Sequence, residues 1–159
     1  MKREGPFLKK KYIASIVSLL LVVSCFLTGC SARSIITTED FKKAAEDKGF
    51  TITTETTTTT GAKDALTASK DGIDIHYFIF EGDGDLTNAK SVYATYKSSI
   101  QNGNVTDEQI LDSDTYCKYV ASAGEIYHFL VRNGRTVVYG KTTLSHKDEV
   151  DQFFTDIKY

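Results

Sequence analysis

Proline and cysteine are both scarce in this 159-residue sequence. The one proline is Pro6, so nothing after it forces a linker or a second domain, and the length leaves room for one domain. The three cysteines are Cys25, Cys30 and Cys117, which leaves a single thiol in the chain after residue 30. One thiol cannot form an internal disulfide, so the domain must depend on its hydrophobic core.

The motifs of the common catalytic and metal sites are missing as well. There is no HExxH or CxxC motif, no glycine-rich phosphate loop and no serine in a nucleophile-elbow pattern. The acidic stretch that begins at Glu81 would need glycine at its sixth position and glutamate at its twelfth to form a calcium loop, but these are Leu86 and Val92. We therefore predict no catalytic residue and no metal ligand, and we interpret the acids as a turn that enters a helix.

A long apolar segment lies near the amino terminus. Five basic residues within the first 11 positions precede an uncharged run from Tyr12 to Gly29. The run is about as long as a transmembrane helix, which needs roughly 20 residues. It ends in Leu27-Thr28-Gly29-Cys30, which resembles the lipobox of bacterial lipoproteins. The resemblance implies that Cys30 receives a diacylglyceryl thioether and that the chain is cleaved after Gly29.

This resemblance sets the expected domain organisation. Residues 1–29 are predicted to be a signal peptide, residues 30–36 a lipidated tether and residues 37–159 a single globular domain. Fatty acyl chains such as palmitate would anchor Cys30 firmly, because each buried methylene contributes about 0.8 kcal/mol. No other cofactor is expected. The domain would lie at the extracytoplasmic face of the cell membrane, where an uncleaved anchor helix, the alternative, would also place it.

The charge balance changes once the signal is removed. Residues 1–29 hold five of the 19 Lys and Arg and one of the 21 Asp and Glu, which leaves 14 basic and 20 acidic residues and a net charge near −6. A domain this acidic lacks the basic surface that binds nucleic acids or anionic lipid headgroups. We therefore expect no nucleic-acid partner.

The rest of the sequence predicts a mixture of helices and antiparallel strands. The first half is expected to form a helix between Thr37 and Gly49, an edge strand over 50–55, and a hairpin of strands over 65–70 and 73–80 around Asp71-Gly72. A helix from Asp85 or Thr87 to Asn102 and a helical turn over 107–111 should follow. The last part is expected to form strands over 116–122, 125–132 and 135–141, with Ala123-Gly124 and Asn133-Gly134 as turns, and then a helix that begins at Ser145. Two-residue turns make consecutive strands antiparallel. The prediction is an α+β domain in the order α-β-β-α-β-β-β-α, with about five strands and three helices on one face of the sheet; the edge strand over 50–55 is an optional addition to this order.

The last three predicted strands carry the candidate interaction face. With those turns, His128 lies opposite Tyr119 on one side and Tyr139 on the other. Helices on one side of a sheet bury one face, which we assign to Phe129, so the face with Tyr119, His128 and Tyr139 is expected to stay exposed and to bind a partner. A tyrosine-rich face without a partner, or one covered by a loop or strand, is the alternative. Cys117 could contact His128, but buried free cysteines are usually packing residues.

These features favour a binding module over an enzyme. Signal, lipidated cysteine, short tether and one small domain together resemble the small lipoproteins of Gram-positive bacteria, a resemblance that implies no particular activity. We expect a non-enzymatic module that meets an envelope protein or peptide. A cell-envelope hydrolase, and an accessory subunit of a transport or secretion system, are the alternatives. The threonine-rich stretch from Thr51 to Thr60 is a solvated edge or, alternatively, a glycan- or ice-binding face.

Overall fold

The computed structural model describes residues 33–56 and 61–159. Arg33–Tyr159 form one compact unit. The predictions for the signal peptide, for Leu27, Thr28 and Gly29 and for the lipid site Cys30 lie outside the described residues. Within the part that is described, no helix has the length and apolar character that crossing a membrane requires.

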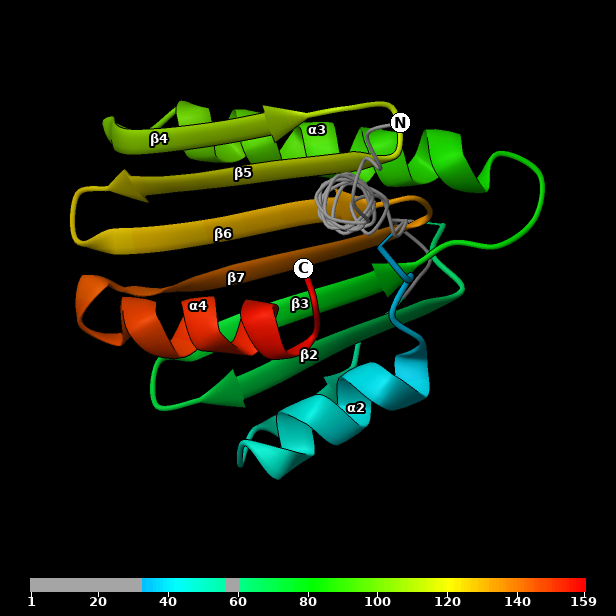
Figure 1. Ribbon diagram of the computed structural model, residues 1–159, viewed down its shortest axis with the longest axis horizontal. Helices are drawn as coiled ribbons and strands as arrows, with labels where there is room; N and C mark the ends of the chain where they lie inside the picture. Colours follow the sequence, from blue (N-terminus) through cyan, green and yellow to red (C-terminus); the bar gives the residue numbers. More distant parts are fainter. Residues whose placement is uncertain (1–32, 57–60) are drawn as a thin grey trace, which may run out of the picture. The chain divides into compact units, whose positions relative to one another are not determined.

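The described residues form three α-helices and one seven-stranded antiparallel sheet (Figure 1). In chain order the elements are α2 (Thr38–Asp47), β1 (Thr51–Thr54), β2 (Asp64–Lys70), β3 (Ile73–Ile79), α3 (Asp85–Gln101), β4 (Val105–Asp112), β5 (Tyr116–Ala123), β6 (Ile126–Asn133), β7 (Thr136–Thr143), a short 3₁₀ turn η1 (Leu144–His146) and α4 (Lys147–Asp156). The strand order across the sheet is β1-β2-β3-β7-β6-β5-β4. The α+β class with an antiparallel sheet and three helices is confirmed.

The strand count and the element order need correction. The sheet has seven strands rather than about five, and the order is α-β-β-β-α-β-β-β-β-α. β1 is the edge strand expected over 50–55, which the five-strand order left out, and β4 lies where a helical turn was predicted. β4 has little apolar alternation, and its pairing with β5 shifts register between Thr106 and Gln109, beside a positive φ at Asp107. Its backbone pairing with β5 therefore decides its structure, while its side chains stay mostly exposed.

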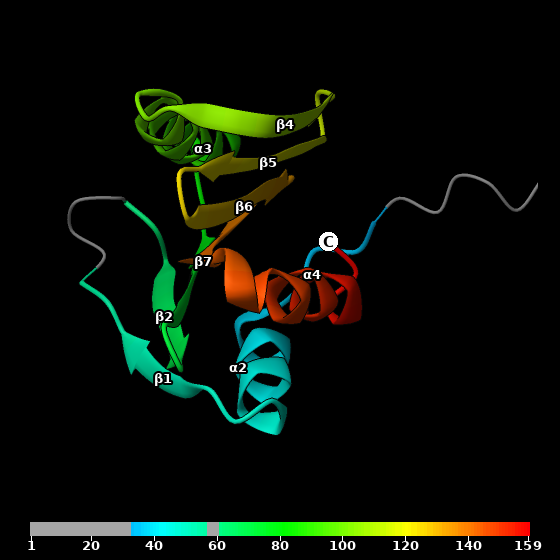
Figure 2. The same cartoon turned by 90° about the vertical axis from the view of Figure 1, so that its left-hand side faces the viewer.

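The helices cover both faces of the sheet, not one (Figure 2). Phe41 of α2 and Phe153 of α4 join the core on one face, together with Tyr77 of β3. On the other face, Tyr93 of α3 packs into a second core with Leu130 of β6. The reason is the connection: α3 joins β3, inside the sheet, to β4 at the far edge, and it crosses the opposite face on the way.

Turn geometry fixes the register of the hairpins. Asp71 and Gly72 both have positive φ, as a type I′ turn requires, and the β2–β3 pairing follows the prediction. The two later turns are Gly124-Glu125 and Gly134-Arg135, one residue further along than predicted. In each, the glycine is the first turn residue and has positive φ, which is the position that a type II′ turn reserves for glycine.

A polar and aromatic candidate site on the open sheet face

The corrected register changes the predicted row of Tyr119, His128 and Tyr139. His128 lies opposite Ala121 and Lys141, while Leu130 lies between Tyr119 and Tyr139. The shift preserves the face on which each side chain lies, but α3 covers much of that face. Tyr119 is 0% exposed, Tyr139 7% and His128 8%. The expectation of an exposed aromatic row is therefore wrong, although His128 and Tyr139 do contact each other.

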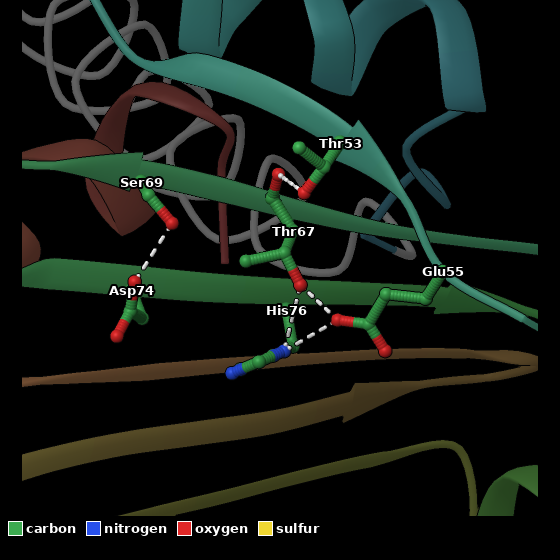
Figure 3. Close-up of polar contacts among 6 residues, drawn as sticks. All are labelled: Thr53, Glu55, Thr67, Ser69, Asp74 and His76. Atoms are coloured by element: carbon green, nitrogen blue, oxygen red, sulfur yellow. Dashed lines mark hydrogen bonds and ion pairs between the residues drawn. The ribbon is translucent and has the colours of Figure 1, made fainter.

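Among the described residues, no helix packs on the same side of the sheet over its other end. α3 packs on β5, β6 and β7, so polar side chains of β1, β2 and β3 remain accessible beyond it. We name this surface the His76 face; its members are Thr53, Glu55, Thr67, Ser69, Asp74 and His76 (Figure 3).

Four strands bring the key side chains of this face into line. Thr67 of β2 pairs with Thr53 of β1 and with His76 of β3, and His76 pairs with Tyr139 of β7. The backbone N–H of Glu55 donates to the carbonyl of Ala65 at 2.8 Å, which keeps Glu55 against β2 just after β1 ends. Because alternate residues of a strand share a face, pairing alone places these side chains in one row.

Glu55, Thr67 and His76 form a hydrogen-bonded cluster (Figure 3). Glu55 Oε1 lies 2.8 Å from His76 Nδ1 and accepts from the hydroxyl of Thr67, whose Oγ1 is 3.0 Å from the same Nδ1. A carboxylate only accepts, so we assign the proton of the neutral imidazole to Nδ1. The Nε2 atom then carries a lone pair, and none of the described residues hydrogen-bonds to it. The His76 side chain is 26% exposed.

The rings of His76, Tyr139 and His128 stack in a row across neighbouring strands, which we call the ring ladder. The rings of His76 and Tyr139 lie 5.8 Å apart at 14°, and those of Tyr139 and His128 lie 5.9 Å apart at 9°. Tyr96 of α3 lies beside this row, with its ring centroid 4.6 Å from that of Tyr139. The His76 face is therefore bordered by aromatic side chains on the side of α3.

The inner end of the ladder is a neutral hydrogen-bonded pair. Burial, and then the charge of Lys141, lowers the pKa of His128. Burial raises the pKa of Tyr139 to about 12. Tyr139 therefore keeps its proton near neutral pH, and its hydroxyl is hydrogen-bonded to Nδ1 of His128 at 2.8 Å.

The pH dependence of stability should report on His128. A histidine whose pKa is lowered in the fold binds fewer protons than it does in the unfolded chain, so its contribution is complete above the reference pKa of 6.5 and is lost as pH falls below it. In His128→Gln, which still accepts from Tyr139, we expect the free energy of unfolding to change less between about pH 7 and pH 5 than in the wild type. Urea unfolding across this range measures the slope. His146→Gln, at a histidine whose side chain is 38% exposed, should keep the wild-type slope; equal slopes in both variants would contradict the assignment.

The described residues contain no group of three or more His, Cys, Asp or Glu side chains placed to hold a metal ion. Cys117 does not meet His128. Its Sγ donates a hydrogen bond to Asp112 Oδ1 at 2.9 Å and accepts one from Nη2 of Arg132 at 3.0 Å. His128 bonds Tyr139 instead. The pairing of a nucleophilic cysteine with His128, weighed from the sequence, is absent from this part of the chain.

Glu55 is the residue of this cluster that sequence reasoning missed. The predicted Asp71-Gly72 turn is sufficient to pair Thr67 with His76 on one face. Nothing local connected Glu55 to them, because β1 and β2 are not joined by a tight turn whose length fixes the register.

No family model and no curated protein sequence matches this chain. Among solved structures, the fold is similar to that of a GTP-binding regulator from Thermotoga maritima, with 10% sequence identity and a TM-score of 0.47. The likeness covers 77% of this chain and 84% of the other. A similarity at this level carries no inference about function.

Proposed function

We propose that the protein is a lipid-anchored, non-enzymatic binding module at the extracytoplasmic face of the cell membrane, and that it contacts an envelope protein or peptide through the His76 face. The observation that carries this proposal is the ordered Glu55–Thr67–His76 cluster on an uncovered part of the sheet. The lipobox resemblance of Leu27-Thr28-Gly29-Cys30 supports the anchor.

The cluster has the properties of a preorganised recognition site. Its side chains are already held by one another, so a partner does not have to order them, and binding costs less conformational entropy. The uncommitted Nε2 of His76 can accept a hydrogen bond, and the hydroxyls of Thr53 and Ser69 and the carboxylate of Asp74 lie on the same face of the sheet. The half-buried ring of Tyr96 adds flat apolar area at the border of the face, and aromatic side chains are frequent in protein interfaces.

A hydrolase is the second candidate, because one observation favours it. Glu55 orients His76 through Nδ1, as an acid orients the general base of many hydrolases, and leaves Nε2 free to take a proton from water. Thr67 does not supply a nucleophile, since its hydroxyl proton goes to Glu55. Turnover of ester or amide model substrates by the wild type, lost in His76→Gln, would favour this alternative over the binding module.

Site-specific photocrosslinking tests the binding proposal. A benzoylphenylalanine in place of Thr53, which is exposed beside the cluster, should capture a protease-sensitive envelope partner in cells that express the full chain. Combining it with Glu55→Ala and His76→Ala should reduce the crosslinked product at least about tenfold, since the loss of even one hydrogen bond to a charged group costs about 1.5–3 kcal/mol.

Two controls make this result specific to the face. The crosslinker in place of Glu46, exposed on α2 at the other side of the sheet, should not capture the same product. Removing a different exposed ion pair, Lys43 with Asp47, should leave the Thr53 product unchanged. Equal capture with and without the Glu55–His76 pair would reject the His76 face as the binding surface. If the captured protein belongs to a transporter or secretion system, the accessory-subunit form of the proposal is favoured.

A further inference from the structure

A groove lies on the opposite side of the sheet from the His76 face. α4 packs on β6 and β7, while β5 and β4 extend past it (Figure 1), and the space between them has a volume of about 470 Å³. Its lining includes Lys118, Tyr127, Phe129, Leu144, Lys147 and Asp151. This volume lies within the range of about 300–1,000 Å³ that is typical of small-molecule sites.

Aromatic side chains form part of the groove lining, which is otherwise largely polar, with Gln109 and Ser122 among its members. Tyr127 and Phe129 are neighbouring residues of the same face of β6, and both are almost fully buried by the core beneath them. Leu144 is one of the few large apolar side chains that the described residues leave exposed, at 40%. Leu144 therefore supplies most of the apolar surface open to a ligand, and Tyr127 and Phe129 add only the small areas that remain exposed.

The charges of the groove are unevenly paired. Asp151 is engaged twice, because it accepts from the Tyr127 hydroxyl and forms an ion pair with Lys147. Lys118 Nζ lies 4.3 Å from the ring centroid of Phe129, and none of the described residues gives it an ion pair or a hydrogen bond. Asp107 at the β4 rim is exposed and does not reach it.

The half-buried ammonium of Lys118 therefore lacks a counterion among the described residues. Burial is the main cause that lowers the pKa of Lys118; Asp151 opposes the effect, whereas Arg33 and Lys147 add to it. A partly desolvated cation without a counterion is stabilised when an anion enters beside it.

We infer that this groove is a second binding site, for a small ligand that combines an anionic head such as a carboxylate with a flat apolar body. Lys118 holds the head, and Leu144 contacts the body, which also reaches the small exposed areas of Tyr127 and Phe129. The site does not depend on the binding role of the His76 face, because the two lie on opposite sides of the sheet.

A series of three probes separates the two halves of the ligand. We expect 3-phenylpropionate to bind the full chain, kept in neutral detergent, with amide NMR shifts concentrated in β5, β6 and α4. Phenylpropanol lacks the charge and propionate lacks the ring, so each should bind at least about tenfold more weakly, as expected when one charge-assisted contact or one ring contact is lost. Failure of 3-phenylpropionate to bind, or shifts spread evenly over the protein, would overturn the inference.

Substitutions of Lys118 test the head group. Lys118→Met keeps an apolar stem over Phe129, so the fold should survive, and 3-phenylpropionate should bind about tenfold more weakly. Lys118→Arg keeps the charge and should retain binding. The matched control is Lys97→Met, because Lys97 is also half-buried and lies 5.4 Å from the ring of Tyr119, on the other side of the sheet. Equal affinity of Lys118→Met and the wild type, with both NMR spectra showing a folded protein, would reject Lys118 as the anion contact.

Discussion

Replacing Cys30 with serine should abolish both lipidation and processing of the amino terminus. A thiol forms the thioether to the diacylglyceryl group, and the serine hydroxyl of Cys30→Ser cannot replace it. The wild-type protein should therefore have lost residues 1–29 and carry lipid on Cys30, whereas Cys30→Ser should keep the mass of the complete 159-residue chain. Mass spectrometry of both purified proteins, with tritiated palmitate fed to the cells, measures the two changes directly.

The other two cysteines provide matched controls for this experiment. Cys25 lies within the apolar run and Cys117 is buried in the domain. Serine at Cys25 should leave cleavage and palmitate labelling as in the wild type, and serine at Cys117 should leave the labelling intact. A wild-type protein that keeps residues 1–29 and carries no lipid would instead establish the uncleaved anchor helix. Loss of the label from Cys117→Ser alone would place the lipid on the wrong residue for our proposal.

Replacing Phe153 with alanine should remove a large part of the stability of the domain. Phe153 of α4 is 1% exposed, and its ring contacts Phe41 of α2 at 5.9 Å and Phe50 at 5.6 Å between centroids. It therefore joins two helices that are distant in the sequence. Truncation of a buried phenylalanine costs about 3–5 kcal/mol, whereas the whole stability of a typical domain is about 5–15 kcal/mol.

Urea unfolding of the full chain gives this cost as a shift of the midpoint at an unchanged slope. Gln152→Ala is the matched control, because Gln152 is the preceding residue of the same helix and is exposed; its effect should stay within about 0.5 kcal/mol. Phe153→Leu should fall between the two, because it retains much of the buried volume. A cost below about 1 kcal/mol for Phe153→Ala would mean that α4 does not depend on this contact.

Much of the local structure could be predicted because neighbouring residues determine it. Thr37 caps α2 as expected, with its hydroxyl accepting from the N–H of Asp40. The Asp71-Gly72 dipeptide fixed the first hairpin, and strand alternation assigned each side chain of β2 and β3 to the correct face. The later turns show the limit of this reasoning, because Asn133-Gly134 matches a type I′ turn while the chain uses Gly134-Arg135.

The candidate site depended on contacts that local patterns do not encode. Glu55 and His76 are 21 residues apart and meet because β1 pairs with β2. Likewise, His76 meets Tyr139 because β3 pairs with β7, and that pairing spans α3 and three intervening strands. Such pairings require closure of long loops, and many alternative partners have similar local sequence patterns.

The sequence by itself determined the α+β class, the antiparallel pairing within hairpins and which side chains share a face, because residues a few positions apart set turn type and alternation. Tertiary structure alone decided that α3 covers the row of Tyr119, His128 and Tyr139 and leaves Glu55, Thr67 and His76 open. The physical reason is that an amphipathic helix can bury its apolar side against either face of a sheet whose two faces are both apolar. The long connection from β3 to β4 determines which face α3 covers.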